Sequence, residues 1–369
     1  MPRHLILSVR FPEADTPRPI ETRLTAHLKT LRRTRLDAEA SSMTAAPEGD
    51  DAPPPIPATG TFVKLTDADH AKITRRAKRL HALREAASGL AHLRKEDRDR
   101  LAILRDGVDL VRLPTEHCAD EIASALHADY PWLAPATEVV WQALRRSVRE
   151  GWPGLRLPPL VLDGPPGVGK SVWARHLAQA LGLPAAVVEA TNANASFAVV
   201  GCQRGWGSAG PGLLVNTILQ RRIGNPIMVI DELEKAGIAE GSAGRSYDLA
   251  AALLPLLEPA TAERWSCPYY EVAFDMRHVG WIMTVNDAQR LPEALRSRCP
   301  PLRLSALTRA DLRDFASRQG ARRGLSDASI DAILEVIDAY ANRAQTPSLR
   351  SLIRMLDRAA DLESKPQAH

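Results

Sequence analysis

The chain has 369 residues, of which 45% are hydrophobic and 25% are charged, a composition typical of a globular protein with roughly two or three domains. Its formal charge of +4 is small for this length, so net charge alone does not indicate a nucleic-acid partner. The four cysteines form no C-x-x-C pair and indicate neither a zinc site nor a disulfide framework. No stretch approaches the ~20 apolar residues of a membrane span, so we expect a cytoplasmic protein without a membrane segment.

The N-terminal part of the chain divides into two regions by composition. Residues 1–60 are poorly defined, and their end, 38–60, is rich in Ala, Pro, Ser and Asp, as flexible linkers are. Residues 61–130 are expected to be helical, because apolar residues recur every three or four positions from Ile73 to Leu90. The other face of this pattern is basic, with Lys72, Arg75, Arg76, Lys78, Arg79 and Arg84. It is either an ordinary solvated face or a surface for nucleic acid or an acidic partner.

Short apolar runs alternate with helical patterns from residue 131 onward. They cover residues 159–163, 185–189, 226–231, 279–285 and 301–304. Continuous apolar runs separated by helices indicate a parallel sheet with helices on both faces. We therefore predict an α/β domain over residues 131–306, followed by a helical region over residues 307–369.

A glycine-rich loop follows the first apolar run and precedes a helical pattern. It reads Gly164, Pro165, Pro166, Gly167, Val168, Gly169, Lys170, Ser171. The match to G-x-x-x-x-G-K-[ST] between a strand and a helix predicts a phosphate-binding loop, in which backbone N–H groups face the phosphates. Lys170 is expected to reach the β- and γ-phosphates of ATP, and Ser171 to offer its hydroxyl to Mg²⁺.

Polar residues at the ends of two further apolar runs point to hydrolysis rather than binding alone. Asp231 ends the run 226–231 and can hold Mg²⁺, and Glu232 beside it can orient and polarise the attacking water. Asn286 follows the run 279–285 and offers an amide to the γ-phosphate or the water. Together with the loop, these residues predict an ATPase.

Two arginines, Arg296 and Arg298, lie in a turn-rich segment before the last apolar run. The planar guanidinium group takes two oxygens and can neutralise charge that develops during phosphoryl transfer. From spacing alone, either arginine is more often a surface residue. The spacing of these two arginines therefore does not by itself assign them a role in phosphoryl transfer.

The glycine-rich loop, the Asp-Glu pair, the asparagine and the arginines follow one another along the chain. In this order they resemble the AAA+ ATPases, and among them the ATPase module of Lon proteases. The likeness runs from about residue 160 to 304. Its most specific stretches are residues 210–214, 225–235, 253–259 and 269–275. The resemblance implies a P-loop core with a five-stranded parallel sheet between helices, a small C-terminal helical lid, and a hexameric ring that uses ATP hydrolysis to pull a polypeptide through its centre.

The resemblance also implies roles for single residues. Asn286 matches sensor 1, and Arg298 matches the arginine finger that acts on the ATP of the neighbouring subunit, with Arg296 as the alternative. Arg350 matches the sensor 2 arginine of the lid, with Arg354 as the alternative. Trp206 falls where Lon carries the aromatic residue of its substrate-gripping pore loop, although a packing role is the competing interpretation.

The chain departs from Lon in three places. It ends shortly after Arg350, so we expect no Ser-Lys protease domain. Gly207 stands where Lon has an apolar partner for the pore aromatic, and residues 236–246 form a Gly- and Ala-rich insertion that we expect in a surface or pore-facing loop. The leading hypothesis is a motor that remodels or unfolds proteins without its own protease. The alternatives are a motor that acts on nucleic acid through residues 70–105 and a scaffold that assembles on binding ATP.

Overall fold

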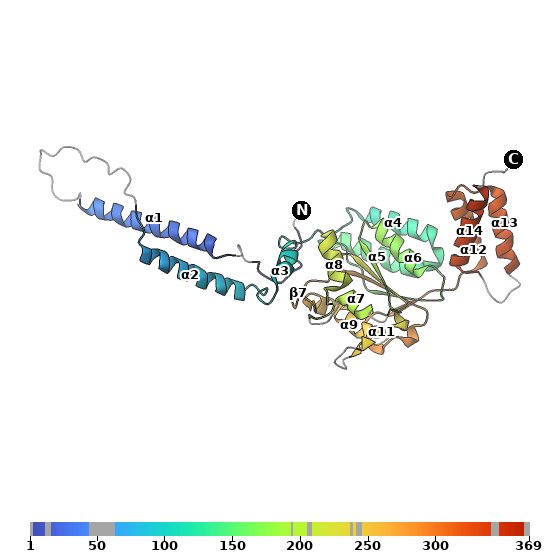
Figure 1. Cartoon of the computed structure of the whole chain (residues 1–369). Helices are drawn as coiled ribbons and strands as arrows, with labels where there is room; N and C mark the ends of the chain where they lie inside the picture. The colour runs from blue at the N-terminus through green and yellow to red at the C-terminus, as the bar shows by residue number, and fades with distance from the viewer. Residues whose placement is uncertain are drawn as a thin grey trace, which may run out of the picture. The chain divides into compact units, whose positions relative to one another are not determined.

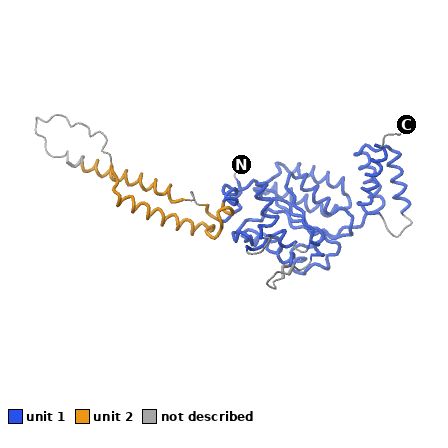
Figure 2. Tube along the Cα trace, in the orientation of Figure 1, with its two compact units in different colours: residues 1–8, 99–369 blue, residues 9–98 orange. Residues whose placement is uncertain are grey.

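The computed structural model describes most of the chain. The described residues are 3–11, 16–43, 63–192, 195–204, 209–236, 239–240, 246–340 and 347–364. They divide into two compact units, one of residues 9–98 and the other of residues 1–8 and 99–369 (Figure 2). Within the described ranges, no helix combines the length and the apolar character that crossing a bilayer requires.

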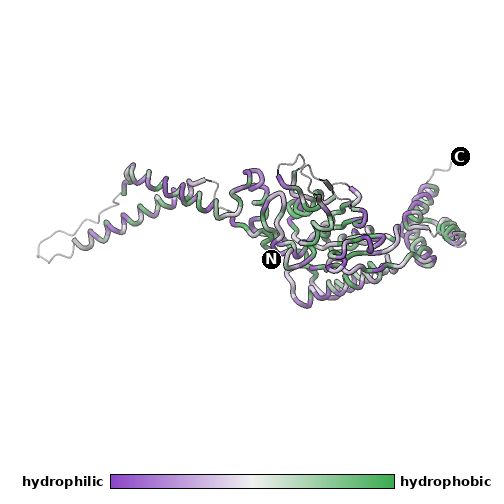
Figure 3. Tube along the Cα trace, turned by 90° about the horizontal axis from the view of Figure 1, so that it is seen from below, coloured by the Kyte–Doolittle hydropathy of each residue, from purple (hydrophilic) through white to green (hydrophobic). Residues whose placement is uncertain are grey.

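The unit of residues 9–98 is built on α1 (Arg18–Met43) and α2 (Asp67–Ala86), which lie side by side (Figure 1). A capping box starts α2, because the Thr66 side chain accepts from the Asp69 N–H and the Asp69 side chain accepts from the Thr66 N–H. Arg32 of α1 forms an ion pair of 2.7 Å with the same aspartate. Hydrophilic residues run along both helices (Figure 3). The apolar spacing predicted α2, whereas no pattern predicted α1.

The other unit contains the predicted five-stranded parallel sheet, which is confirmed. Its order is β2 (Ala185–Glu189), β3 (Ile227–Asp231), β8 (Gly280–Val285), β1 (Leu160–Asp163) and β9 (Pro301–Arg303). Each strand lies within one of the five predicted apolar runs. Because all the strands are parallel, their carboxyl ends meet at one edge of the sheet.

Helices cover both faces of this sheet (Figure 1). One face carries α4 (Glu116–Asp129), α5 (Ala134–Arg149) and α6 (Lys170–Ala180), and the other carries α7 (Ala195–Val200), α9 (Leu249–Leu257) and α11 (Glu293–Arg298). Apolar strand residues such as Leu162 and Val229 pack with α4, α5 and α6 in one core. The remaining elements of the unit are α8 (Gly212–Arg221), α10 (Pro259–Ala262), and the short strands β4 (Ala239–Glu240), β5 (Ser246–Tyr247), β6 (Trp265–Ser266) and β7 (Ala273–Phe274), while α3 (Lys95–Ala102) spans the boundary between the units.

The C-terminal part of the chain is helical, with α12 (Arg309–Arg322), α13 (Asp327–Ala339) and α14 (Leu349–Glu363). Thr308 and Asp311 form a capping box at the start of α12. Leu352 and Leu356 of α14 are fully buried and belong to the same apolar core as the sheet. The helical region therefore packs on the sheet domain close to the carboxyl ends of the strands, where the glycine-rich loop lies.

Candidate nucleotide-binding site

The glycine-rich loop connects β1 to α6 and has a backbone that only glycine adopts easily. Gly167 and Gly169 have φ angles of 81° and 92°, in the left-handed region. A Cβ atom on Gly164 would lie 2.9 Å from the Cβ of Leu304, and one on Gly167 would lie 2.8 Å from the Cβ of Ser348. The glycines of the motif therefore allow both the curvature of the loop and its close packing.

The loop is held from two sides. The indole Nε1–H of Trp132 donates to the carbonyl of Val168 at 2.8 Å. From the helical region, the N–H of Leu349 donates to the carbonyl of Gly167 at 3.2 Å. These contacts fix the shape of the loop from within the protein, so a phosphate would meet a preformed cradle.

Lys170 begins α6 and is almost completely buried, with 7% of its surface exposed. Its Nζ donates to the carbonyls of Gly164 at 2.5 Å and Pro165 at 3.1 Å and to the Asn286 Oδ1 at 3.2 Å. Burial lowers the pKa of this amine, and nearby carboxylates, Glu234 foremost, act in the opposite direction. All three partners are neutral oxygens, and among the described residues no carboxylate is in direct contact with the ammonium group.

Asp231 lies at the carboxyl end of β3, opposite the β8 residue Thr284. Its Oδ1 accepts hydrogen bonds from the Ser171 hydroxyl at 2.6 Å and from the Thr284 hydroxyl. The Thr284 oxygen in turn accepts from the N–H of Glu232 at 3.1 Å. Two hydroxyl groups thus orient one carboxylate, which leaves the other carboxylate oxygen for a cation.

Glu232 follows this aspartate with a φ angle of 54°, an uncommon conformation for a residue with a side chain. Its carboxylate lies 2.8 Å from the ammonium group of Lys235, and this hydrogen bond raises the pKa of the lysine. Both side chains are half-exposed. The pair is therefore a weak one that a ligand can displace.

Asn286 has its amide orientation fixed by Glu234. The backbone N–H and the Nδ2 of Asn286 donate to the Glu234 Oε1 at 3.0 and 2.9 Å. The Asn286 Oδ1 accepts from the ammonium group of Lys170. The asparagine thereby connects the loop to the segment after β3.

These groups surround one cavity of about 610 Å³ at the carboxyl ends of the strands. Of the predicted site residues, it is lined by Pro166, Gly167, Val168, Gly169, Lys170, Ser171, Asp231, Glu232, Asn286 and Arg350, and Arg354 lines it as well. Residues that the sequence did not single out complete the lining, among them Tyr130, Arg175, Glu189, Thr284, Phe315, Leu349 and Ile353. The structure thus brings residues at or just after the ends of four strands, β1, β2, β3 and β8, together with residues of α14.

The two candidate finger arginines lie outside this cavity. Arg298 ends α11, is exposed, and donates from Nε to the Glu258 carboxylate at 2.5 Å. Arg296 donates to the Gln289 side chain at 2.9 Å. Trp206 and most of the insertion 236–246 fall outside the described residues. Neither arginine therefore acts on the cavity of its own chain in this arrangement.

Sequence reasoning missed Thr284 and Glu234, which position Asp231 and Asn286. A signal for Thr284 exists, since it lies on β8 two residues before Asn286, which directly follows the strand, and residues two apart along an extended chain point to the same side. Its contact with Asp231 required knowledge that β8 neighbours β3. For Glu234 the sequence carried no comparable signal, because the turn after β3 decides where its carboxylate lies.

The donor set fits a nucleotide with its metal ion. A buried amine whose partners are neutral suits an anionic polyphosphate, and the loop presents backbone N–H groups around it. Carboxylate and hydroxyl oxygens, as in Asp231 and Ser171, are the hard ligands that Mg²⁺ takes. The arrangement can bind a nucleoside triphosphate and places a second carboxylate, that of Glu232, within the same cavity.

Comparisons with known proteins agree with this geometry. Residues 160–305 match the family described as "ATPase family associated with various cellular activities (AAA)". The chain is 30% identical over 212 residues to Lon protease 2 of Thermus thermophilus, covering 55% of this chain and 26% of that protein. It is 29% identical over 232 residues to the peroxisomal Lon protease homolog 2 of Xenopus laevis, covering 60% and 26%. For Lon protease 1 of Herpetosiphon aurantiacus, the identity is 28% over 272 residues, covering 68% and 33%.

The chain spans about a third or less of the length of these relatives. The matched family region contains the whole glycine-rich loop, Asp231, Glu232 and Asn286, and it extends over all five strands of the parallel sheet. Residues 160–305 therefore form an AAA ATPase domain, similar to the one in Lon proteases.

Proposed function

We propose that this chain binds ATP with Mg²⁺ and hydrolyses it to drive the remodelling or unfolding of a protein substrate. The observation that carries the proposal is Lys170, a buried amine whose hydrogen-bond partners among the described residues are neutral oxygens, at the base of a cavity that also holds Asp231 and Glu232. Such a cation favours an anionic ligand, and the two carboxylates give that ligand a metal site and a base.

Each residue has a distinct task in this proposal. Lys170 and the loop N–H groups hold the β- and γ-phosphates, while Ser171 and Asp231 would hold Mg²⁺, which neutralises charge on the phosphate oxygens when bound. Glu232 leaves Lys235 and accepts a proton from the attacking water.

The remaining side chains complete the hydrolytic geometry. Asn286, fixed by Glu234, presents its amide toward the water or the γ-phosphate. Arg350 reaches the phosphates from the helical region of residues 307–369, which acts as a lid on the sheet domain of residues 131–306. The lid therefore links nucleotide occupancy to the position of α14.

Hydrolysis is proposed to require a neighbouring subunit. Arg298 is exposed and lies outside its own cavity, which supports an action on the ATP of the next subunit in a ring, as the hexamers of the resembled family imply. The relatives are named Lon proteases, which supports a polypeptide as the substrate. A cytoplasmic location is supported by the free thiols of all four cysteines.

The test compares the wild-type chain with Glu232→Gln. The variant keeps the shape of the side chain but cannot accept a proton, so ATP hydrolysis should fall by on the order of 100-fold or more while ATP affinity stays within a few-fold. Phosphate release measures turnover, and loss of fluorescence from a tailed fluorescent protein measures unfolding. Unchanged turnover in Glu232→Gln contradicts the base assignment, and normal turnover without any unfolding by the wild type contradicts the protein-remodelling role.

A second candidate function, action on nucleic acid, is favoured by one observation. Lys72, Arg75, Arg76, Lys78 and Arg79 are all exposed on α2. Cations arranged in this way neutralise phosphates, so this function predicts duplex binding that weakens steeply with salt. Binding of a labelled duplex measured at several salt concentrations decides between the two functions.

A further inference from the structure

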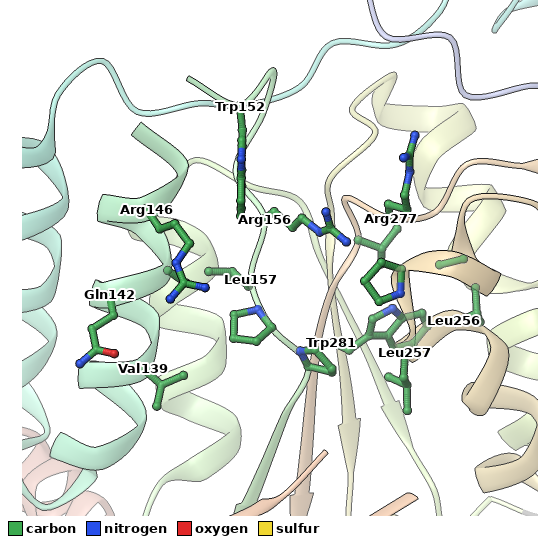
Figure 4. Close-up of a pocket in the computed structure, with 16 residues that line it drawn as sticks. Val139, Gln142, Arg146, Trp152, Arg156, Leu157, Leu256, Leu257, Arg277 and Trp281 are labelled. Atoms are coloured by element: carbon green, nitrogen blue, oxygen red, sulfur yellow. The ribbon is translucent and has the colours of Figure 1, made fainter. Parts of the chain in front are cut away.

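A second cavity, of about 320 Å³, lies at the amino ends of the strands, away from the nucleotide site (Figure 4). Its walls come from α5, from residues 152–159 before β1, from the junction of α9 and α10, and from the start of β8. All of these elements belong to one compact unit. Nothing in the proposed ATPase cycle uses this cavity.

Arginine side chains surround the cavity, as Figure 4 shows for Arg146, Arg156 and Arg277. Arg277 is already paired, with Asp275 at 2.6 Å and Glu263 at 3.4 Å. Among the described residues, Arg146 and Arg156 have no carboxylate within 4.0 Å of their guanidinium groups. Within the described part of the chain, two cations therefore face this space without an anionic partner, and Arg146 is the exposed one of the two.

Arg156 is the more enclosed of these two cations. Its guanidinium carbon lies 5.8 Å from the centre of the Trp152 ring, so an aromatic face covers one side of the group. Burial first, and then repulsion from Arg277, lowers the pKa of Arg156 below its ordinary range. An arginine stays charged even so, and an anion in the cavity would relieve both effects.

The wall formed by β8 contains an unused donor. Trp281 is 2% exposed, and its indole Nε1–H has no acceptor within the part of the chain that the structure describes. Buried indole N–H groups ordinarily find a partner. A ligand oxygen in the cavity that Trp281 lines would supply the missing acceptor.

The chemistry of the remaining wall distinguishes among anions. Pro158, Pro159 and Pro259 line the cavity and have no backbone N–H, so this part of the wall has no amide donors of the kind that a glycine-rich loop offers to a phosphate. Leu256 and Leu257 give it an apolar side. A few side-chain donors beside an apolar surface suit a carboxylate, which carries one charge on two oxygens, on an apolar body.

We propose that this cavity binds a carboxylate carried on an apolar group. Arg146 and Arg156 pair with the carboxylate, and the indole N–H of Trp281 is the neutral donor. The carboxylate comes either from a free small molecule or from the C-terminus of a polypeptide with apolar last residues. The site takes no part in ATP hydrolysis. An experiment that contradicts carboxylate binding therefore leaves the proposed ATPase function unaffected, and the reverse also holds.

Calorimetric titration of the full chain with 2-naphthoate, and with the uncharged 2-naphthamide as the matched control, tests the charge requirement. The carboxylate should bind at least about 10-fold more tightly than the amide. Only the carboxylate carries a negative charge, so only it can form charge-assisted hydrogen bonds with the two arginines. Equal affinities of the two compounds, or no binding of 2-naphthoate, overturn the proposal.

Variants test the place of binding. Arg156→Gln and Trp281→Phe should each weaken 2-naphthoate binding, the first by on the order of 10-fold. Lys170→Ala, which alters the nucleotide site, should leave it unchanged. Circular dichroism checks that each variant is folded, and Arg156→Gln carries the test if Trp281→Phe does not fold. Unchanged affinity in folded Arg156→Gln, or loss of affinity in Lys170→Ala, places the binding elsewhere and overturns the proposal.

Two further probes identify the source of the carboxylate and test whether a phosphate is the preferred ligand instead. An acetylated Leu-Leu-Leu peptide with a free C-terminus is compared with the same peptide ending in an amide. Tighter binding of the free peptide than of 2-naphthoate supports a polypeptide source, and the reverse order supports a small molecule. Phenyl phosphate that binds more tightly than both carboxylates overturns the choice of a carboxylate.

Discussion

Lys170 and Arg298 are both cations assigned to phosphate, yet they lie in opposite environments. Lys170 is 7% exposed and is held by three neutral oxygens inside a network that connects two strands and the glycine-rich loop. Arg298 is exposed at the end of a short helix, and it forms an ion pair with Glu258 in which the side chains are 35% and 43% exposed. The first is preorganised within one chain, whereas the second can exchange its partner.

This difference predicts that Lys170 determines ATP affinity, whereas Arg298 affects the rate of hydrolysis. A buried, hydrogen-bonded cation meets its ligand without reorganisation, so it should determine affinity. An exposed ion pair contributes little to stability, and breaking it for a new partner costs little. We therefore expect changes around Lys170 to affect a single subunit, and changes around Arg298 to appear only where subunits meet.

Lys170→Ala should have the largest effect. It removes the charge beneath the phosphates, so ATP affinity should fall by at least about 100-fold, and turnover should fall with it. Titration with a fluorescent ATP analogue measures the affinity, and Lys170→Arg is the control that keeps the charge but not the shape. Normal ATP affinity in Lys170→Ala would contradict the assignment of the cavity to nucleotide.

Arg298→Ala should leave ATP affinity intact but reduce turnover by on the order of 1,000-fold, as expected for a lost arginine finger. Mixing this variant with Glu232→Gln should restore part of the turnover, because some mixed interfaces combine an intact cavity with an intact arginine. Arg296→Ala is the matched control on the same helix. Absence of rescue in the mixture would count against a site shared between subunits.

The sheet and the loop were predictable because their signals are local. Each strand is a continuous apolar run, and the loop motif carries its own conformational requirement at Gly167 and Gly169. The helix α1 was not predicted, because its polar composition leaves no clear apolar stripe. Composition predicts a linker over residues 38–60, although α1 continues to Met43.

The contacts that position the site were harder to predict, because they join residues far apart in the sequence. The hydrogen bond from Thr284 to Asp231 depends on the order of the strands, which apolar runs alone do not reveal. The contact between Glu234 and Asn286 depends on a turn whose first residue, Glu232, has a positive φ angle that its residue type does not favour. Residue types predicted many of the groups that line the cavity, but not how they are held.

Thr284→Val tests how the buried network positions Asp231, the proposed metal ligand. The substitution keeps the volume of the side chain but removes one of the two hydroxyl donors to Asp231, so the Mg²⁺ concentration for half-maximal hydrolysis should rise by about 10-fold. Thr284→Ser keeps the hydroxyl and should behave as the wild type. An unchanged Mg²⁺ requirement in Thr284→Val would mean that Ser171 alone orients the carboxylate.

Glu258→Gln should have the smallest effect. It tests the exposed ion pair between Glu258 and Arg298. It removes the charge that pairs with Arg298, and because both side chains are partly exposed the free energy of unfolding should change by less than about 1 kcal/mol. Turnover should be retained, since under the proposed shared site the freed arginine still acts on the neighbouring subunit. Urea unfolding followed by circular dichroism measures the stability, and Glu263→Gln, which removes an exposed carboxylate from Arg277, is the matched control. A loss of more than about 3 kcal/mol would show that the pair holds the fold together and that Arg298 does not exchange its partner.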